Sequence, residues 1–161
     1  MLDDKDRAIL ALLSKNARIT ISSIASLIKM SDVATKKRLV KLESKGVILG
    51  YRPIVNPREL GYEAIAFIGL NTEPGRVVEV AEVLSNRRDT TFVAIASGDH
   101  EVIAELWARN TKELLQKIKD LEKISGVKEI CPAIIVNVVK QYTSIPEEFI
   151  TESSERESAS S

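Results

Sequence analysis

The sequence predicts an α+β protein in which a helical module of residues 1–62 precedes a βαββαβ domain of residues 63–142. Apolar residues recur at helical spacing in the first part, and strand-like runs alternate with two helical patterns in the second. The charge divides at the same place, because residues 1–62 hold twelve Lys and Arg against six Asp and Glu, whereas the remainder holds eleven against seventeen. A module of net charge +6 joined to one of −6 indicates a polyanion as partner of the first.

The composition is that of a globular protein, with 44% hydrophobic and 29% charged residues. No apolar run approaches the roughly 20 residues that a membrane span needs, and the acidic start MLDDKDR is unlike a signal peptide. We therefore expect a cytoplasmic protein without a membrane partner. A single Cys131 and a single His100 leave no internal disulfide, no multi-Cys zinc site and no His-based triad, so we expect no catalytic site, no metal and no cofactor.

Three helices are expected in the first part. The pattern of residues 3–16 is amphipathic, with acids at its positive N-terminal end. Thr20 or Ser22 can cap a second, short helix, and Ser31 can cap a third that ends near Gly46. Because a turn of about three residues joins the second helix to the third, the arrangement is a helix-turn-helix.

Beyond the third helix, VILGYRPIV (47–55) alternates and is rich in β-formers, which predicts a two-stranded wing or a crossing strand. NPRELGY (56–62) is a connector, because Pro57 blocks regular pairing and Gly61 permits a turn. The following domain has the order of the ferredoxin-like split, four antiparallel strands with both helices on one face. Its expected elements are strand 63–71, helix 74–86, strands 90–96 and 101–108, helix 111–124 and strand 127–141.

The strands of this domain are apolar on both faces, as AFIGL, FVAIA and IIVNVV illustrate. With both helices on one face, the other face would stand in water unless something covered it. A second subunit is the simplest cover, which predicts a homodimer. The last stretch, TESSERESASS from Thr151, has no apolar periodicity, so we expect the extension 143–161 to be mobile from there.

The third helix, in SDVATKKRLVKLESKGVI (31–48), carries a cluster of basic residues. At about 100° per residue, Thr35, Leu39 and Leu42 share the face that points to the other helices. Lys37 lies at the centre of the opposite face, and Lys36 and Lys41 lie on its flanks. Such a face is either a solvated surface or a grip on phosphates.

Its place as third helix of a helix-turn-helix in the basic module favours phosphates, and hence DNA. The N-terminal end would lead into the major groove, where short side chains permit a close approach to base edges. Arg38 lies nearer the inward face, so it either braces the helix or reaches a phosphate from the side. The predicted DNA-binding residues are Ser31, Val33, Ala34, Lys36, Lys37, Arg38, Lys41 and Arg52.

The chain resembles the Lrp/AsnC (leucine-responsive, feast/famine) transcriptional regulators over roughly residues 2–142. The matching segments are LDDKDRAILALL, NARIT, MSDVATKKRLVKLESKGVILGY, NPRELG, SGDHEVIAEL and SGV before the last strand. The spacing LE-x-x-GVI-x-GY followed by N-P-x-x-LG is specific to this resemblance. It implies a regulator that binds operator DNA and dimerises through its sheet, and whose dimers often assemble into tetramers or octamers.

The resemblance also implies a small effector, usually an amino acid, bound near a hairpin turn that has the sequence G-D-x-D in many members of the family. The matching positions are Gly98, Asp99, His100 and Glu101. An Asp in a turn also commonly caps its own backbone, and a turn His is also commonly solvated. Two other functions stay open: a ligand-independent architectural DNA-binding protein, and, remotely, an enzyme resembling sirohaem decarboxylases, which rely on histidines beside a tetrapyrrole.

Overall fold

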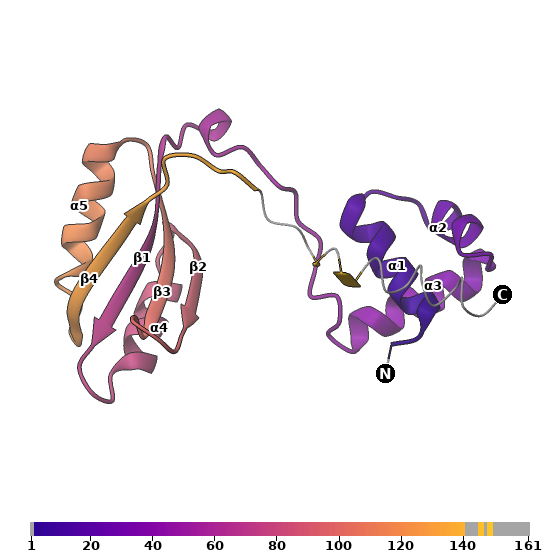
Figure 1. The fold of residues 1–161 in the computed structure, drawn as a ribbon, viewed down its shortest axis with the longest axis horizontal. Helices are drawn as coiled ribbons and strands as arrows, with labels where there is room; N and C mark the ends of the chain where they lie inside the picture. The colour runs from indigo at the N-terminus through magenta and orange to yellow at the C-terminus, as the bar shows by residue number, and fades with distance from the viewer. Residues whose placement is uncertain (1, 141–144, 147, 150–161) are drawn as a thin grey trace. The chain divides into compact units, whose positions relative to one another are not determined.

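The computed structural model describes residues 2–140, 145–146 and 148–149, and the chain falls into two compact units (Figure 1). The first unit consists of residues 2–54 with the described residues from 140 onward, and the second consists of residues 55–139. Within the first unit the guanidinium of Arg7 lies 4.8 Å from the ring centroid of Phe149. The predicted mobile stretch from Thr151 lies outside the described residues.

The first unit is the predicted set of three helices, α1 (Asp4–Lys15), α2 (Ile21–Leu27) and α3 (Asp32–Ser44). Each begins at a side-chain cap: Asp3 accepts from the Asp6 N–H at 2.9 Å, Thr20 from the Ser23 N–H, and Ser31 from the Ala34 N–H. These caps satisfy backbone donors that have no partner in the first turn of a helix. The helices enclose a small core of Ile9, Ile24, Ile28 and Leu42.

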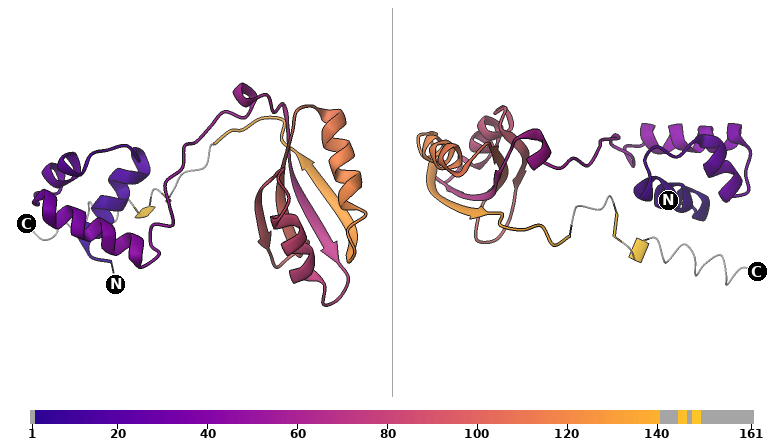
Figure 2. Two further views of the ribbon diagram at one scale, coloured as in Figure 1. Left: turned by 180° about the vertical axis from the view of Figure 1, so that it is seen from behind. Right: turned by 90° about the horizontal axis from the view of Figure 1, so that it is seen from above.

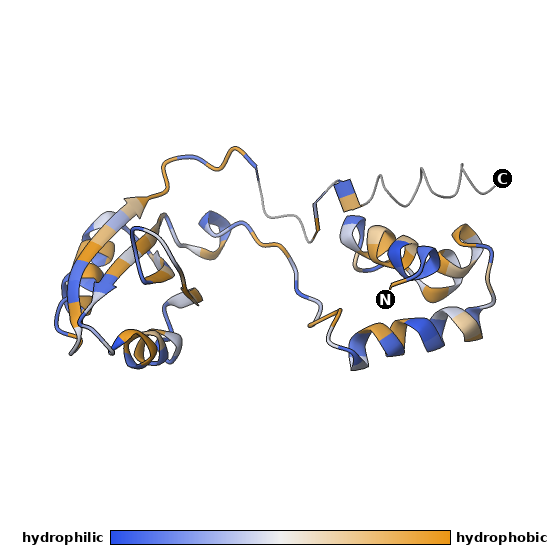
Figure 3. Cartoon of the chain, turned by 60° about the horizontal axis from the view of Figure 1, so that its bottom comes forward, coloured by the Kyte–Doolittle hydropathy of each residue, from blue (hydrophilic) through white to orange (hydrophobic). Residues whose placement is uncertain are grey.

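The segment after α3 is extended but unpaired in the described chain, so neither the predicted two-stranded wing nor the alternative crossing strand forms there. Residues 49–56 have no regular secondary structure, and no strand pairs with them in the described part of the chain. Pro53 has no N–H to donate, and β-formers without a neighbouring strand cannot form a ladder. Their apolar side chains therefore stay in water, and Leu49 is 94% exposed. Figure 3 shows hydrophobic residues within this segment and also within residues 135–139.

The second unit has the predicted βαββαβ order. A short 3-10 turn (η1, Arg58–Leu60) in the connector leads into a sheet with strand order β2-β3-β1-β4, in which every neighbouring pair is antiparallel. Helices α4 and α5 pack on one face of this sheet (Figure 2). The elements are β1 (Ala64–Thr72), α4 (Val77–Ser85), β2 (Thr90–Ile95), β3 (Val102–Ala108), α5 (Thr111–Leu121) and β4 (Val127–Ile134).

Alternation along the strands separates a buried face from an open one. The buried face packs against apolar residues of α4 and α5, and it includes Ile68, Leu70 and Leu106 at 0% exposure. On the opposite face Phe67 lies across from Glu105 and Ala133, and Phe92 is 48% exposed. The prediction that one face of the sheet is left open is therefore confirmed.

In the second unit, three element boundaries differ from the predicted ones by more than one residue. Helix α4 begins at Val77 and not at Pro74, because Gly75 adopts φ +81° and breaks helical backbone there. Helix α5 ends at Leu121, three residues early. Strand β4 ends at Ile134, although the Ile135 N–H still donates to the Ile65 carbonyl of β1 at 2.9 Å; the predicted end, Gln141, lies outside the described residues. No helix among the described residues is long and apolar enough to cross a membrane.

Candidate DNA-binding and effector sites

The turn between α2 and α3 is held by backbone and side-chain hydrogen bonds. Lys29 adopts a left-handed φ of +54°, and the Met30 N–H donates to the Ala25 carbonyl at 2.9 Å. The Ser22 hydroxyl donates to the carboxylate of Asp32, the first residue of α3. These contacts fix the direction in which α3 leaves the turn, as a helix-turn-helix requires.

Helix α3 has the predicted inward and outward faces. Thr35 is fully buried against the other two helices, and Leu39 packs on the same core. On the outward side Val33 is 80% exposed, next to the cap at Ser31. Ala34 is half-buried beside it. The N-terminal turn of α3 therefore presents short side chains to solvent.

The lysines of this outward face are available to an external anion. Lys36, Lys37 and Lys41 are exposed and form no ion pair with any described residue. The two acids of α3 do not offset them by direct pairing, because Asp32 accepts from Ser22 and Glu43 accepts from the Tyr51 hydroxyl at 2.9 Å. Three unpaired ammonium groups on one helix face can neutralise phosphates.

Arg38 makes a different contact. Its Nη1 atom lies 2.6 Å from Asp3 and 2.7 Å from Asp6 at the start of α1. The side chain of Asp6 is only 5% exposed, and that of Arg38 is 27% exposed. Partial burial raises the pKa of Asp3, but the Asp6 N–H and the Arg38 guanidinium outweigh it and hold that pKa below its ordinary value. Of the two roles open to Arg38, the structure shows the brace.

Arg52 is exposed in the unpaired segment after α3. The residue before it ties this segment to the helix through the Tyr51–Glu43 hydrogen bond. Partial burial of the phenol and its bond to the carboxylate raise the pKa of Tyr51 to about 12, so the hydroxyl stays a donor at neutral pH. This contact is the only described side-chain hydrogen bond between α3 and the segment, and it holds the residue next to Arg52 against the helix.

The hairpin turn that joins β2 to β3 holds the predicted effector residues. Gly98 adopts φ +137°, which favours glycine, and Asp99 is exposed without a described partner. The His100 imidazole lies over Gly69 of β1, where an added Cβ would come within 2.2 Å of its ring. Its Nδ1 lies 3.3 Å from the Asn71 side-chain oxygen. The turn therefore places His100 on the open face of the sheet.

Glu101 points to a different partner. Its Oε2 accepts from both the backbone N–H and the hydroxyl of Thr72, each at 2.7 Å. These bonds hold the pKa of Glu101 below its ordinary value. The longer side chain of Glu, compared with the final Asp of the G-D-x-D pattern, thus secures the turn to the end of β1. Of the four predicted residues, Asp99 and His100 are the side chains left to face a ligand.

Two contacts were missed by sequence reasoning. Asp3 and Asp6 look like ordinary acids at a helix N-terminus, and their pairing with Arg38 spans more than thirty residues of sequence. Thr72 carries no motif that marks it as partner of Glu101. The low exposure expected for Asp6, in the apolar register with Ile9, was the one available signal. Among the described residues no group of three or more His, Cys, Asp or Glu is placed to hold a metal ion.

Comparison with known proteins agrees with this geometry. Residues 2–43 match the model of the AsnC-type helix-turn-helix domain. The HTH-type transcriptional regulator LrpA of Pyrococcus horikoshii is 40% identical over 141 residues, which cover 87% of this chain and 100% of that protein. The regulator FL11 of Pyrococcus furiosus is 28% identical over 91% of this chain and 97% of its own length.

The fold is also found in solved structures. Escherichia coli AsnC superposes with a TM-score of 0.81 at 23% identity, covering 89% of this chain and 97% of that one. The regulator NMB0573 of Neisseria meningitidis, solved as a complex with L-Met, gives a TM-score of 0.84 at 20% identity, over 93% and 99% of the two chains. The identity with LrpA over nearly the whole chain decides the assignment. This chain belongs to the Lrp/AsnC family of helix-turn-helix transcriptional regulators.

Proposed function

We propose that the protein regulates transcription by reading a specific operator with the N-terminal half of α3. The observation that carries this proposal is the outward face of α3, where Lys36, Lys37 and Lys41 are exposed and unpaired in the described part of the chain. In a helix-turn-helix this helix enters the major groove with its N-terminal residues at the base edges. Val33 and Ala34 would read bases there, and the lysines would hold phosphates on either side.

The two arginines have separate roles in this proposal. Arg38 holds α3 against Asp3 and Asp6, so that the helix meets the groove at a fixed angle. Arg52 is exposed in the segment after α3 and would contact the DNA backbone from outside the helix. Ser31 would add its backbone N–H, or its hydroxyl, to a phosphate at the start of α3.

A binding comparison tests sequence specificity. Fluorescence anisotropy would be measured with duplex DNA from upstream of the protein's own gene and with a shuffled duplex of equal length and composition. Specific regulators prefer their site by about 10³-fold or more at physiological salt, and we expect a preference of that order. Equal affinity for the two duplexes would refute specific recognition and favour the architectural alternative.

Footprinting separates regulation from DNA compaction directly. A dimer with two recognition helices reaches half-sites about 34 Å apart, so discrete, pseudo-palindromic and helically phased protection is expected. Uniform coverage would instead indicate an architectural protein. The sirohaem decarboxylase alternative receives no support from the relatives, which are transcriptional regulators. Action on operator DNA supports the proposed cytoplasmic location.

We propose further that an amino acid or a similar effector binds at the hairpin turn, with Asp99 taking its ammonium group and His100 its carboxylate. The exposure of Asp99 and the absence of a described partner for it support this role, and Gly98 permits a close approach of the ligand. One relative in fold was solved with L-Met bound. Thermal-shift screening of all amino acids should find a stabilising ligand, and Asp99→Ala should abolish its effect; a shift that survives the substitution would exclude this site.

The open face of the sheet supports a homodimer, with tetramers or octamers built from it. Phe67 and Phe92 lie on that face, and its apolar area has no cover within the described chain. Light scattering after size exclusion should report twice the 17.8 kDa chain mass or a larger even multiple. Phe92→Glu should shift the population toward monomer; a monomeric wild-type protein would contradict the proposal.

A further inference from the structure

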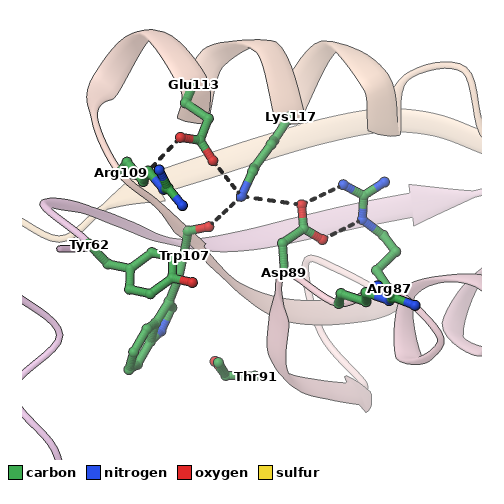
Figure 4. Close-up of a pocket in the computed structure, with 9 residues that line it drawn as sticks. Tyr62, Arg87, Asp89, Thr91, Trp107, Arg109, Glu113 and Lys117 are labelled. Carbon is green, nitrogen blue, oxygen red and sulfur yellow. Dashed lines mark hydrogen bonds and ion pairs between the residues drawn. The ribbon is translucent and has the colours of Figure 1, made fainter. Parts of the chain in front are cut away.

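The second unit contains a cleft of about 680 Å³, and Figure 4 shows the side chains that line it. Its walls come from Tyr62 in the connector ahead of β1, the turn between α4 and β2 with the start of β2, the end of β3, and the first turns of α5. The hairpin turn precedes Val102, the first residue of β3, and the cleft lies at Trp107 near the end of that strand. At about 3.3 Å per residue, the two sites are roughly 20 Å apart. The cleft is therefore separate from the proposed effector site.

The cleft is basic although it belongs to the acidic half of the chain. Residues 63–161 hold eleven Lys and Arg against seventeen Asp and Glu. Four of these eleven bases line the cleft, and they meet only two acids there. The four bases are Arg87, Arg88, Arg109 and Lys117, and the two acids are Asp89 and Glu113.

Both acids are already engaged with bases of the cleft. Asp89 accepts from Arg87 through two bonds of 2.8 and 2.9 Å, and Lys117 lies 3.5 Å from it. Glu113 lies 2.9 Å from Lys117 and also accepts from the Arg109 backbone N–H. Burial raises the pKa of Asp89, but the hydrogen bonds and charges around it, those of Arg87 first and then Lys117, together outweigh burial and hold this pKa below its ordinary value. The Lys117 hydrogen bond lowers the pKa of Glu113 in the same way. Both carboxylates are therefore ionised and paired at neutral pH.

After these ion pairs, two guanidinium groups of the cleft remain without a carboxylate partner among the described residues. Arg88 and Arg109 are exposed, and neither forms an ion pair with a carboxylate of the described chain. A guanidinium offers a planar fork of donors that matches a carboxylate or a phosphate. Two such groups in the lining of one cleft, which also holds a network of salt bridges, have the character of an anion site.

The side of the cleft opposite α5 is aromatic. Tyr62 and Trp107 pack edge to face, with ring centroids 5.6 Å apart. Aromatic rings beside guanidinium groups suit a ligand that joins a flat or apolar body to an anionic group. The phosphate backbone of DNA would contact the arginines but would leave the aromatic rings unused. The lining therefore favours a small molecule over DNA.

We infer that this cleft binds a small organic anion, a carboxylate or phosphate on a planar or apolar body, held by Arg88 and Arg109 against Tyr62 and Trp107. The site is additional to the effector site at the hairpin. The inference does not depend on the proposed DNA recognition, because ligand binding is measured on the protein alone.

The chain contains a single tryptophan, Trp107, so its fluorescence reports directly on the cleft. The full-length protein would be titrated with benzoate and, separately, with inorganic phosphate at constant ionic strength. The test variant is Arg88→Gln with Arg109→Gln. The control is Lys112→Gln with Lys119→Gln, which removes the same charge from exposed positions of α5 outside the cleft.

We expect a saturable fluorescence change in the wild type with at least one of the two probes, benzoate giving the tighter binding. Loss of two charge-assisted hydrogen bonds should raise the dissociation constant by about tenfold or more in the test variant and leave it unchanged in the control. Matching thermal unfolding of the two variants would show that folding is intact. The inference is overturned if neither probe saturates, or if both variants bind as the wild type does.

Discussion

The guanidinium of Arg38 lies 2.7 Å from the nearly buried carboxylate of Asp6, and this contact joins the centre of α3 to the first turn of α1. Asp3 completes the cluster and caps α1 in the same geometry. The helix that carries the basic face is thus fixed by a charged contact on its inward side. Its outward lysines have no such partner in the described chain.

Removing this brace should destabilise the first unit. Arg38→Gln would leave Asp6 as a mostly buried carboxylate without its cation, and for a pair that keeps some solvent access we expect a loss of about 2 kcal/mol in the free energy of unfolding. Lys36→Gln, at an exposed position on the same helix, should change it by less than about 0.5 kcal/mol. Urea unfolding measures both variants. Equal stability of the two would show that the brace contributes nothing.

The packing of His100 on Gly69 can be tested with a double-mutant cycle. Gly69→Ala would bring a methyl group against the imidazole ring, and the displacement should cost about 1–3 kcal/mol. In a His100→Ala background the same substitution should be close to neutral, since the methyl group then has room. A coupling energy near zero in urea unfolding would mean that the ring does not rest on Gly69 in solution.

Acid should weaken the second unit through Asp89. Arg87 and Lys117 hold the pKa of this carboxyl below its value in the unfolded chain, despite its partial burial. The stabilisation is therefore fully present above about pH 4 and is lost as the pH falls through the lower folded pKa. Asp89→Asn should lower the melting temperature at pH 7, and this difference from wild type should shrink progressively below about pH 4.

Asp99→Asn is the control for that experiment, because Asp99 is exposed and has no described partner. Its melting temperature should follow that of the wild type at every pH. If Asp89→Asn and the wild type differ by the same amount at pH 7 and at pH 3, the ion pairs of Asp89 do not stabilise the folded state.

The helices and the βαββαβ order of elements along the chain could be predicted because both depend on local patterns. The cap at Ser31 and the inward spacing of Thr35 and Leu42 depend only on residues that are close in sequence, and the structure confirms them. The prediction of a wing was wrong for the opposite reason, because β-forming residues such as Leu49 become a strand only when another strand pairs with them. The predicted start of α4 is too early because the left-handed conformation of Gly75 depends on the loop that contains this residue.

The contacts that give the candidate sites their character depend on distant residues. Arg38 meets Asp3 and Asp6 only after three helices have packed, and Glu101 meets Thr72 only through the strand register. The basic cleft assembles side chains from Tyr62 to Lys117, none of which forms a motif in sequence. Sequence patterns could therefore locate the basic helix and the hairpin turn. Which charged side chains are paired and which are left unpaired could be seen only in the folded structure.

The salt dependence of operator binding tests most directly whether the outward lysines of α3 grip DNA. Each phosphate that a protein neutralises contributes about 0.9 to the slope of log K against log salt. Lys37→Ala with Lys41→Ala should therefore weaken binding to operator and shuffled DNA alike and reduce the magnitude of the slope by about 1.8. Lys112→Ala with Lys119→Ala, on α5, should leave the slope unchanged. An unaltered slope in the α3 variant, or an equal reduction in the α5 control, would contradict the assignment of this face to DNA.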